Sequence, residues 1–548
     1  MKICVIHVFF VILQPQKVKS TSKICFNTMN RYTRRSFTLV LAVLSVVVSK
    51  AHVPNYINPV LPYDYSDPDV IRVGQTYLMT SSSFNNVPGL QLLASGDLVH
   101  WEIVDAAIRY RLPGYEEGDP VAGNFVWAPS IREHEGRLYI YYGDPDRGIY
   151  CIRSKPFDSR LPAIRFPLEW EEPVLVIAGK GLIDPCPLWD DDGHVWLVHA
   201  LAGSRAGLKS VLLMAELTSD GLDVKTPGRI IFDGHEEHPT CEGPKLYKRN
   251  GYYYIMHPAG GVKTGWQVVQ RSRNIYGPYE RKVTLQQGRT TVNGPHQGAW
   301  VDTPEGEGFF LHFQDVGAAG RIVHMQPLKW VNGWPEIGKD GEPILMYKGT
   351  EEKGNTEPSW ANFARRDEFD STVLALDWQW SGGRIEPQWF FCDAPKSCLR
   401  LYSAPREQND WMPNMLLQKI PATAFTAMAR VRFVPLKDKK MLGAEHAGMI
   451  VTGRKASFKL EVPVTDEWCW LRLEMDEHQR GQYYIALERN GQKDPAEWNK
   501  AGEPFQAVAG YWTGAQVGFF CTRDKTINDA GWLDIDWFEI QITPSSHP

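Results

Sequence analysis

The chain has 548 residues, with 59 Lys and Arg against 64 Asp and Glu, and therefore a formal net charge of −5. This length exceeds what one compact core usually serves, so we expect at least two domains. Hydrophobic residues make up 43% and charged residues 22%, which excludes a disordered or collagen-like chain. The first 51 residues hold eight basic residues and no acidic one, so the remainder carries a net charge of −13. A body this acidic excludes nucleic acid as a partner.

The N-terminal segment has the pattern of an export signal. Residues 30–35 are basic, residues 37–48 are apolar, and Ser49-Lys50-Ala51 follows. This order predicts a secretory signal peptide cleaved after Ala51, with Met29 as the true start and residues 1–51 as leader. Twelve apolar residues are too few to span about 30 Å of hydrocarbon, and no second long apolar run follows. We therefore expect a soluble periplasmic or extracellular protein without a stable membrane span.

Seven cysteines follow the leader, and none has the spacing of a metal site. Cys392 and Cys398 are close enough in the sequence to close a short disulfide loop in an oxidising compartment. Buried free thiols are the alternative, and we favour it for most of the seven.

Five similar segments follow one another along residues 52–345. Each has a proline near its start, then a polar turn with glycine, then an aromatic-rich strand, which is the signal of a β-hairpin. Their landmark residues lie 60, 57, 58 and 54 positions apart, and they are Asp67, Trp127, Asp184, Glu242 and His296. A period of 50–60 residues with several strands per unit is typical of a β-propeller. The sequence therefore predicts five blades whose innermost strands meet around one axis.

Three of the landmarks are carboxylates, namely Asp67, Asp184 and Glu242. Such residues converge in a propeller, and like charges raise one another's pKa, so that one carboxyl group keeps its proton near neutral pH. One acid and one base are what glycoside hydrolysis needs. Each motif alone is also an ordinary turn sequence. Their occurrence at one phase of a fivefold repeat favours catalysis.

These motifs resemble glycoside hydrolase family 43 over nearly the whole mature chain. Ser66-Asp67-Pro68-Asp69-Val70 is similar to the family's general-base motif, with Asp67 as the base. Ile183-Asp184-Pro185 is similar to the motif of the carboxylate that tunes and orients the acid, and Cys241-Glu242-Gly243-Pro244 to the general-acid motif. The family inverts configuration, which implies about 6.5–9.5 Å between the carboxyl groups of Asp67 and Glu242. Asp69 is the alternative base, two positions along the strand.

The resemblance implies roles for further residues. Trp127 corresponds to an aromatic residue that lines the sugar pocket, with a blade-core tryptophan as the alternative. Arg321 resembles the arginine that contacts the bound sugar, with a surface arginine as the alternative. His296 resembles a histidine that helps to hold a hydrated calcium in several members, and a hydrogen-bonded core histidine is the alternative. Phe84 and Trp266 are candidate stacking residues because of their aromatic character near the loops.

The propeller pattern fades near Pro343. Residues 346–362 are predicted to be a linker, and residues 363–548 contain short alternating runs that predict a β-sandwich. Leu376–Trp380, Leu416–Lys419 and Asp534–Phe538 resemble the concanavalin-A-like C-terminal domain attached to many family 43 xylosidases and arabinofuranosidases. In that group the sandwich packs on the propeller and lends a loop to the pocket. Asp534 and Asp536 are either calcium ligands or turn carboxylates, and we favour the turn.

The expected protein is thus an all-β, two-domain exo-glycosidase that needs no redox or organic cofactor. The resemblance implies release of terminal β-D-xylose or α-L-arabinofuranose from plant polysaccharide or oligosaccharide. Two alternatives remain: an endo-acting arabinan hydrolase, which predicts an open groove, and a non-catalytic carbohydrate-binding propeller, which predicts a missing carboxylate.

Overall fold

A computed structural model describes residues 53–543, apart from 118, 120–121, 159–163, 350–357, 361–363, 407–411, 439–442, 455, 464–465, 489–494, 496 and 527. The predicted signal peptide and the start at Met29 lie outside the described residues. Within them nearly every element is a strand. The helices are the short α2 (Gly203–Ala206) and the 3-10 turns η1 (Gly317–Ala319), η2 (Pro387–Trp389) and η3 (Ala394–Lys396). In the described part no helix has the length and apolar character needed to cross a membrane.

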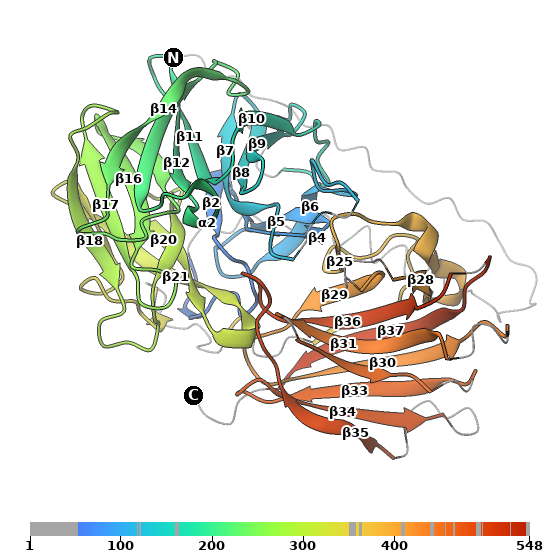
Figure 1. Cartoon of the computed structure of the whole chain (residues 1–548). Coiled ribbons are helices and arrows are strands. Elements are labelled where there is room, and N and C mark those ends of the chain that lie inside the picture. Colours follow the sequence, from blue (N-terminus) through green and yellow to red (C-terminus); the bar gives the residue numbers. More distant parts are fainter. Residues whose placement is uncertain are drawn as a thin grey trace, which may run out of the picture. The chain divides into compact units, whose positions relative to one another are not determined.

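Five antiparallel four-stranded sheets form the β-propeller that the repeat predicts (Figure 1). The first sheet skips β4 and the other four use consecutive strands. The strands are β2 (Asp69–Val73), β3 (Thr76–Thr80), β5 (Gly89–Ser95), β6 (Glu102–Ile108), β7 (Trp127–His134), β8 (Arg137–Asp144), β9 (Gly148–Arg153), β10 (Val174–Ala178), β11 (Leu182–Trp189), β12 (Val195–Leu201), β13 (Val211–Leu217), β14 (Val224–Asp233), β15 (Lys245–Arg249), β16 (Tyr252–Ala259), β17 (Trp266–Ser272), β18 (Glu280–Gln286), β19 (His296–Asp302), β20 (Gly308–Asp315), β21 (Arg321–Val331) and β22 (Trp334–Ile337).

The second strand of each blade explains the aromatic runs in the sequence. In β3 the consecutive residues Tyr77, Leu78 and Met79 are all buried. A strand covered on one face buries every second side chain, whereas these side chains pack against both neighbouring blades. The runs are therefore continuous because each blade lies between two others.

The N-terminal segment closes the ring. β1 (Tyr56–Ile57) pairs with β23 (Met346–Tyr347), which lies inside the segment predicted as a linker. Leu61 forms a bridge with Val323 on β21. The first described residues are thereby joined to the last blade, and the segment that leads to Asp67 is held beside β21.

The C-terminal domain is the predicted β-sandwich. Its eight-stranded sheet has the order β26-β27-β37-β30-β33-β34-β35 with β24 beside β37, and its seven-stranded sheet has the order β32-β31-β36-β29-β25-β4 with β28 beside β36. The strands are β24 (Ala364–Asp367), β25 (Gln379–Ser381), β26 (Phe390–Asp393), β27 (Cys398–Tyr402), β28 (Ala404–Pro405), β29 (Met415–Lys419), β30 (Phe425–Val434), β31 (Glu445–Gly453), β32 (Ala456–Glu461), β33 (Cys469–Met475), β34 (Arg480–Leu487), β35 (Asn499–Gln506), β36 (Gln516–Arg523) and β37 (Trp532–Ile542).

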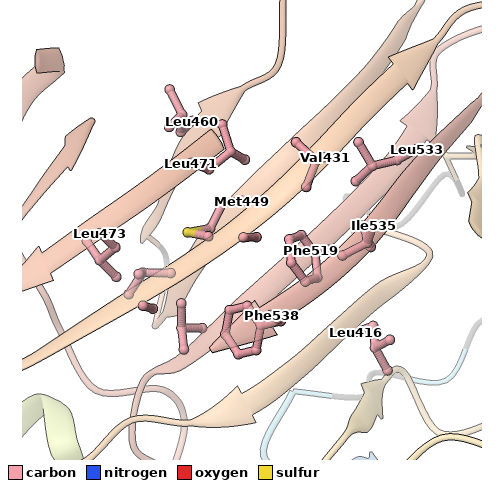
Figure 2. Close-up of a cluster of buried hydrophobic side chains, with 14 of the residues drawn as sticks. Leu416, Val431, Met449, Leu460, Leu471, Leu473, Phe519, Leu533, Ile535 and Phe538 are labelled. Carbon is pink, nitrogen blue, oxygen red and sulfur yellow. The ribbon is translucent and has the colours of Figure 1, made fainter. Parts of the chain in front are cut away.

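Alternate residues of facing strands fill the space between the two sheets. Val431, Met449, Leu471, Phe519 and Phe538 belong to one buried cluster (Figure 2). The two-residue alternation of β30, buried at every second position from Phe425 onward, matches this one-sided burial. The apolar pattern alone was therefore enough to locate most strands of this domain.

A strand of the propeller region completes one sheet of the sandwich. β4 (Asn86–Val87) pairs with β25, and the Gln379 side chain donates a hydrogen bond of 2.8 Å to the Pro88 carbonyl. β4 follows Phe84 by two residues, so a loop of the first blade is part of both domains. The sandwich is in this way fixed beside the first blade.

Strand pairing and hydrogen bonds decide two questions that the sequence left open: whether Cys392 and Cys398 form a disulfide, and whether Asp534 binds calcium. The seven described cysteines are free thiols. Because Cys392 pairs with Leu399 and Asp393 with Cys398, the side chains of Cys392 and Cys398 lie on opposite faces of the sheet. Asp534 is buried and accepts hydrogen bonds from Arg400 and Arg432, so it is neither a turn carboxylate nor an open calcium ligand.

Candidate active site

In every blade a residue with a left-handed backbone conformation lies near the start of the innermost strand, either two residues before it or within its first three residues. These residues are Asp67 (φ 56°), Ala128 (34°), Asp184 (57°), Gly243 (56°) and Gln297 (27°). Trp127, Glu242 and His296 each come one position earlier. Asp67 and Asp184 thus share one phase of the repeat, whereas Glu242 shares its phase with Trp127 and His296. The prediction that all three carboxylates share one phase was therefore off by one position for Glu242.

This backbone conformation is costly where a side chain is present. L-residues at positive φ are uncommon, and residues held there cost on the order of 1–3 kcal/mol each and cluster at functional sites. At Gly243 a Cβ would lie 2.2 Å from Gln297 Cγ, so glycine is required there for space as well as for φ. This conformation sets the direction of the Asp67 side chain just before β2 and of the Asp184 side chain within β11.

One cavity of about 270 Å³ contains all three carboxylates. Its other walls are mostly aromatic and aliphatic, and its lining residues are Asp67, Phe84, Trp127, Ala128, Ile183, Asp184, Thr240, Glu242, Gly261, Val262, Gln297, Arg321 and Trp512. The predicted residues Phe84, Trp127 and Arg321 are therefore brought together with the carboxylates. Trp266 and His296 are not among the lining residues.

Asp67 is buried and held by two donors. The Ser82 hydroxyl donates to Asp67 Oδ2 at 2.5 Å, and Arg321 Nη1 lies 3.4 Å from Asp67 Oδ1. Burial raises the pKa of Asp67, with a smaller contribution in the same direction from Glu242, while Arg321, Ser82 and His296 lower it. A carboxylate with a raised pKa is a stronger base, as activation of water requires.

Asp184 lies where the first strand of the third blade bulges, between Ile183 and Cys186. Its Oδ2 accepts hydrogen bonds from the Gly243 N–H at 2.7 Å and from the Gln297 amide at 3.2 Å. Burial, followed by the negative charges of Glu242 and Asp67, raises the pKa of Asp184 well above its ordinary value.

Glu242 is the most accessible of the three, with 28% of its side chain exposed against 7% for Asp67. His296 is fully buried, and its Nε2 lies 2.9 Å from Glu242 Oε1. His296 therefore lies behind the carboxylate and orients it. With Oε1 engaged, Oε2 is the oxygen left to face a substrate.

The alternative base, Asp69, has a structural role. It is fully buried, and its Oδ2 accepts hydrogen bonds from the Ile131 N–H at 2.8 Å and from Arg132 at 2.7 Å. It does not line the cavity. Asp67 and Asp69 are only two residues apart, but Asp67 lines the cavity while Asp69 contacts the second blade.

Among the aromatic lining residues, the sequence reasoning missed Trp512. Trp512 belongs to the sandwich, has a φ of 63° and is 53% exposed. Its ring meets that of Trp127 edge to face at a centroid distance of 6.0 Å. The signal in the sequence is an aromatic pair between two glycines, Gly510-Tyr511-Trp512-Thr513-Gly514, outside any strand pattern. No periodicity indicates that such a loop reaches another domain.

Trp266 lies elsewhere for a simple reason. Its indole N–H donates to His238 Nδ1 at 3.2 Å, and its ring packs beside Gly260 and the core between the third and fourth blades. Aromatic character near a loop therefore did not distinguish a packing ring from a binding ring.

The charge of Arg321 allows a prediction about pH. If Asp67 is the base, it must be ionised, and kcat/KM is then expected to fall as the pH falls through its raised pKa. Arg321→Met removes a positive charge that lowers this pKa, so the acid limb of kcat/KM is expected to move to higher pH. Arg321→Lys, which keeps the charge, is the matched control and should leave the limb nearly in place. An acid limb that stays fixed in the methionine variant contradicts this assignment.

Comparison with known proteins agrees with this site. The sequence model described as Glycosyl hydrolases family 43 matches residues 56–335. The model described as Beta xylosidase C-terminal Concanavalin A-like domain matches residues 366–460 and 447–541. A putative beta-xylosidase of Xylanibacter ruminicola is 34% identical over 484 residues, which cover 83% of this chain and 85% of that protein. A non-reducing end alpha-L-arabinofuranosidase of Bacteroides ovatus is 27% identical over 425 residues, covering 72% and 73%.

The fold is also that of solved structures. A family 43 protein from Bacillus licheniformis superposes with a TM-score of 0.73 at 23% identity and covers 89% of this chain and 100% of its own. The extent of these matches, together with three carboxylates in one cavity at the centre of a five-bladed propeller, leads to one conclusion: the chain belongs to glycosyl hydrolase family 43 and carries the family's C-terminal concanavalin-A-like domain.

Proposed function

We propose that the protein is an exo-acting, inverting glycosidase that releases terminal β-D-xylose or α-L-arabinofuranose from plant polysaccharide or oligosaccharide. The observation that carries the proposal is the shared cavity of Asp67, Asp184 and Glu242, with an aromatic wall that includes a residue of the second domain. Relatives named beta-xylosidase and alpha-L-arabinofuranosidase support the sugar class.

The chemistry follows from the positions of the three carboxylates. Asp67 takes a proton from water, and the water oxygen bonds to the anomeric carbon from the face opposite to the leaving group. Glu242 gives its proton to the glycosidic oxygen, and the bond between that oxygen and the anomeric carbon breaks. Asp184 is a positioning residue, since its charge and its bond to the N–H beside Glu242 act through the acid. The sugar is released with inverted configuration, and the two carboxyl groups have exchanged protonation states.

The walls of the cavity favour removal of single end units. A volume of about 270 Å³ is small, and Trp512 projects from the sandwich next to Trp127. A groove for internal cleavage needs room on both sides of the cleaved bond, and Trp512 occupies one side of this site. A binding propeller without catalysis remains less favoured, because all three carboxylates are present in the cavity.

The decisive experiment compares substrates and products. Purified protein is incubated with 4-nitrophenyl α-L-arabinofuranoside, 4-nitrophenyl β-D-xylopyranoside and linear xylo- and arabino-oligosaccharides. We expect pentose monomers as the first products, and proton NMR should show the anomer opposite to that of the substrate. Internal fragments as first products support the endo-acting alternative. A folded protein that binds these sugars but hydrolyses none of them supports the binding alternative.

The family resemblance predicts a hydrated calcium held through His296. The buried Nδ1 of His296 has no hydrogen-bond partner among the described residues, which leaves one atom for a bound water. The described residues contain no group of three His, Cys, Asp or Glu side chains arranged for a metal, and calcium takes six to eight oxygen ligands. The buried ammonium of Lys245 instead lies among the innermost strands, bonded to Ser130 and the Pro129 carbonyl. These side chains do not fit a calcium site, and we derive no step through one.

We therefore expect that chelation has little effect on the enzyme. Dialysis against EDTA should leave kcat within about twofold of the untreated protein, because the described residues contain no group of three His, Cys, Asp or Glu side chains arranged for a metal. Loss of activity that Ca²⁺ restores and Mg²⁺ does not would contradict this expectation.

Export of the protein is proposed on the leader alone, and N-terminal sequencing of secreted protein should find a start just after Ala51.

A further inference from the structure

The loop that carries Trp512 is tied to the turn before β21 by its backbone. The Ala515 N–H donates to the Ala318 carbonyl at 2.6 Å. Gln479 of the sandwich also binds this turn. Its side chain accepts a hydrogen bond from the Ala318 N–H at 2.7 Å and donates one to the Val316 carbonyl at 2.9 Å. The turn leads directly into Arg321. The two domains therefore meet at the point where the propeller presents Arg321 to the cavity.

Asp64 lies at the centre of this contact. Its Oδ1 accepts a hydrogen bond from the Arg321 N–H at 2.9 Å, and its Oδ2 accepts one from the Gly514 N–H at 2.8 Å. The Tyr65 N–H donates to the Arg321 carbonyl at 3.0 Å, so both backbone groups of Arg321 are held by residues 64–65. Only 8% of Asp64 is exposed. One buried carboxylate thus joins the two domains.

The three connected segments each carry a residue of the cavity. Asp67 follows Asp64 by three positions, and Trp512 precedes Gly514 by two. The Arg321 guanidinium lies 3.4 Å from Asp67 and 5.8 Å from the centroid of the Trp512 ring. A change at Asp64 therefore reaches the base, the arginine and the tryptophan through very short lengths of chain.

The backbone beside Asp64 is closely packed at Gly320. At Gly320 (φ 80°) an added Cβ would lie 2.6 Å from the Gly514 nitrogen and 2.7 Å from the Asp64 carboxyl. This close approach requires glycine at position 320. Without the carboxylate the N–H groups of Arg321 and Gly514 lose their acceptor, and a buried donor without an acceptor is costly.

We propose that Asp64 is a positioning residue, which sets Trp512 and Arg321 relative to Asp67 and so couples the sandwich domain to catalysis. The proposal rests on the proposed function of the same cavity. It makes the sandwich part of the active site, because Asp64 connects the loop of Trp512 and the backbone of Arg321 to the segment that carries the base.

The test is a double-mutant cycle between Asp64 and Trp512. Asp64→Ala, Trp512→Ala and the double variant are assayed for kcat and KM on the pentoside that wild type hydrolyses. Misplacement of catalytic groups by about 1 Å costs up to about a hundredfold, so we expect Asp64→Ala to lower kcat/KM by about tenfold to a hundredfold. In the Trp512→Ala background the loss should be clearly smaller, because part of it acts through the tryptophan.

Two further variants separate positioning from general stability. Asp64→Asn keeps one acceptor oxygen but places an N–H₂ against a second donor, so its kcat/KM should lie between those of wild type and Asp64→Ala. Ser66→Ala is the matched control, since it removes only the 3.0 Å bond from the Ser66 hydroxyl to Asp64 Oδ1 and leaves both backbone donors paired. Its kcat/KM should stay close to the wild-type value.

The outcomes are distinguishable. If wild type hydrolyses no pentoside, the proposed function fails before Asp64 is tested. If wild type is active and folded Asp64→Asn has the wild-type kcat/KM, the inference is wrong. It is also wrong if the losses of Asp64→Ala and Trp512→Ala multiply without coupling. Should Asp64→Ala fail to fold, the asparagine variant completes the same cycle.

Discussion

Asp67→Asn is expected to lower kcat by about 10² to 10⁴-fold on every substrate that the protein hydrolyses. The amide cannot take a proton from water, while its size lets it keep a partner for Ser82. KM should change much less than kcat, because the base acts on water rather than on the sugar. The measurement is steady-state kinetics, with thermal unfolding to show that the variant is folded.

Two comparisons make this result specific. Azide, a small anion that attacks without a base, should restore part of the activity of Asp67→Asn on an aryl pentoside and yield the inverted glycosyl azide. Ser82→Ala keeps the carboxylate and removes its 2.5 Å hydrogen bond, together with the 2.7 Å bond that the Ser82 hydroxyl accepts from the Ala128 N–H. Because the base itself is retained, this variant should lose far less activity than the asparagine variant. If both variants lose activity equally and azide restores none, Asp67 is not the base.

Glu242→Gln is expected to have a large effect that depends on the leaving group. The glutamine keeps an oxygen for His296 but has no proton to give to the glycosidic oxygen. On a pentose oligosaccharide, whose leaving group needs protonation, kcat should fall by about 10² to 10⁴-fold. On a 2,4-dinitrophenyl pentoside, whose leaving group departs as a stable anion, kcat should fall much less.

The comparison of leaving groups identifies the acid because other defects of a variant do not change the ratio of its activities on the two substrates. A variant that is merely misfolded or binds sugar poorly loses activity equally on both substrates. Asp67→Asn is the internal control, since loss of the base should affect both substrates to a similar degree. An equal loss on both substrates for Glu242→Gln would remove Glu242 from the role of acid.

Much of the candidate site could be predicted because it repeats. Asp67, Asp184 and Glu242 were recognisable through the Pro-containing segments that start each blade, and the repeat itself implied that distant segments converge. The burial of Asp69 under Arg132 could not be predicted, because two carboxylates in one short motif look equivalent until a neighbouring blade contacts one of them. The position of Glu242 within the repeat, one residue before that of Asp67 and Asp184, likewise could be assigned only from the left-handed residues of the five blades.

Some of the site residues that were predicted one at a time, without support from the repeat, line the cavity, and others do not. Phe84, Trp127 and Arg321 line the cavity. Trp266 packs against the core between two blades, and His296 lies behind Glu242. An aromatic residue near a loop has the same local signature in either role. Its role depends on which neighbouring blade approaches it, and local sequence does not contain that information.

The sequence by itself determined the all-β class, the five blades, the sandwich and the three carboxylates, because alternation, turns and a regular period are properties of local chain segments. Only the tertiary structure decided which aspartate faces the cavity, that Trp512 forms part of its wall, and that Asp64 connects both domains at Arg321. These features join residues as far as 450 positions apart. Contacts of that kind arise from how two folded domains pack, and no periodicity along the chain encodes them.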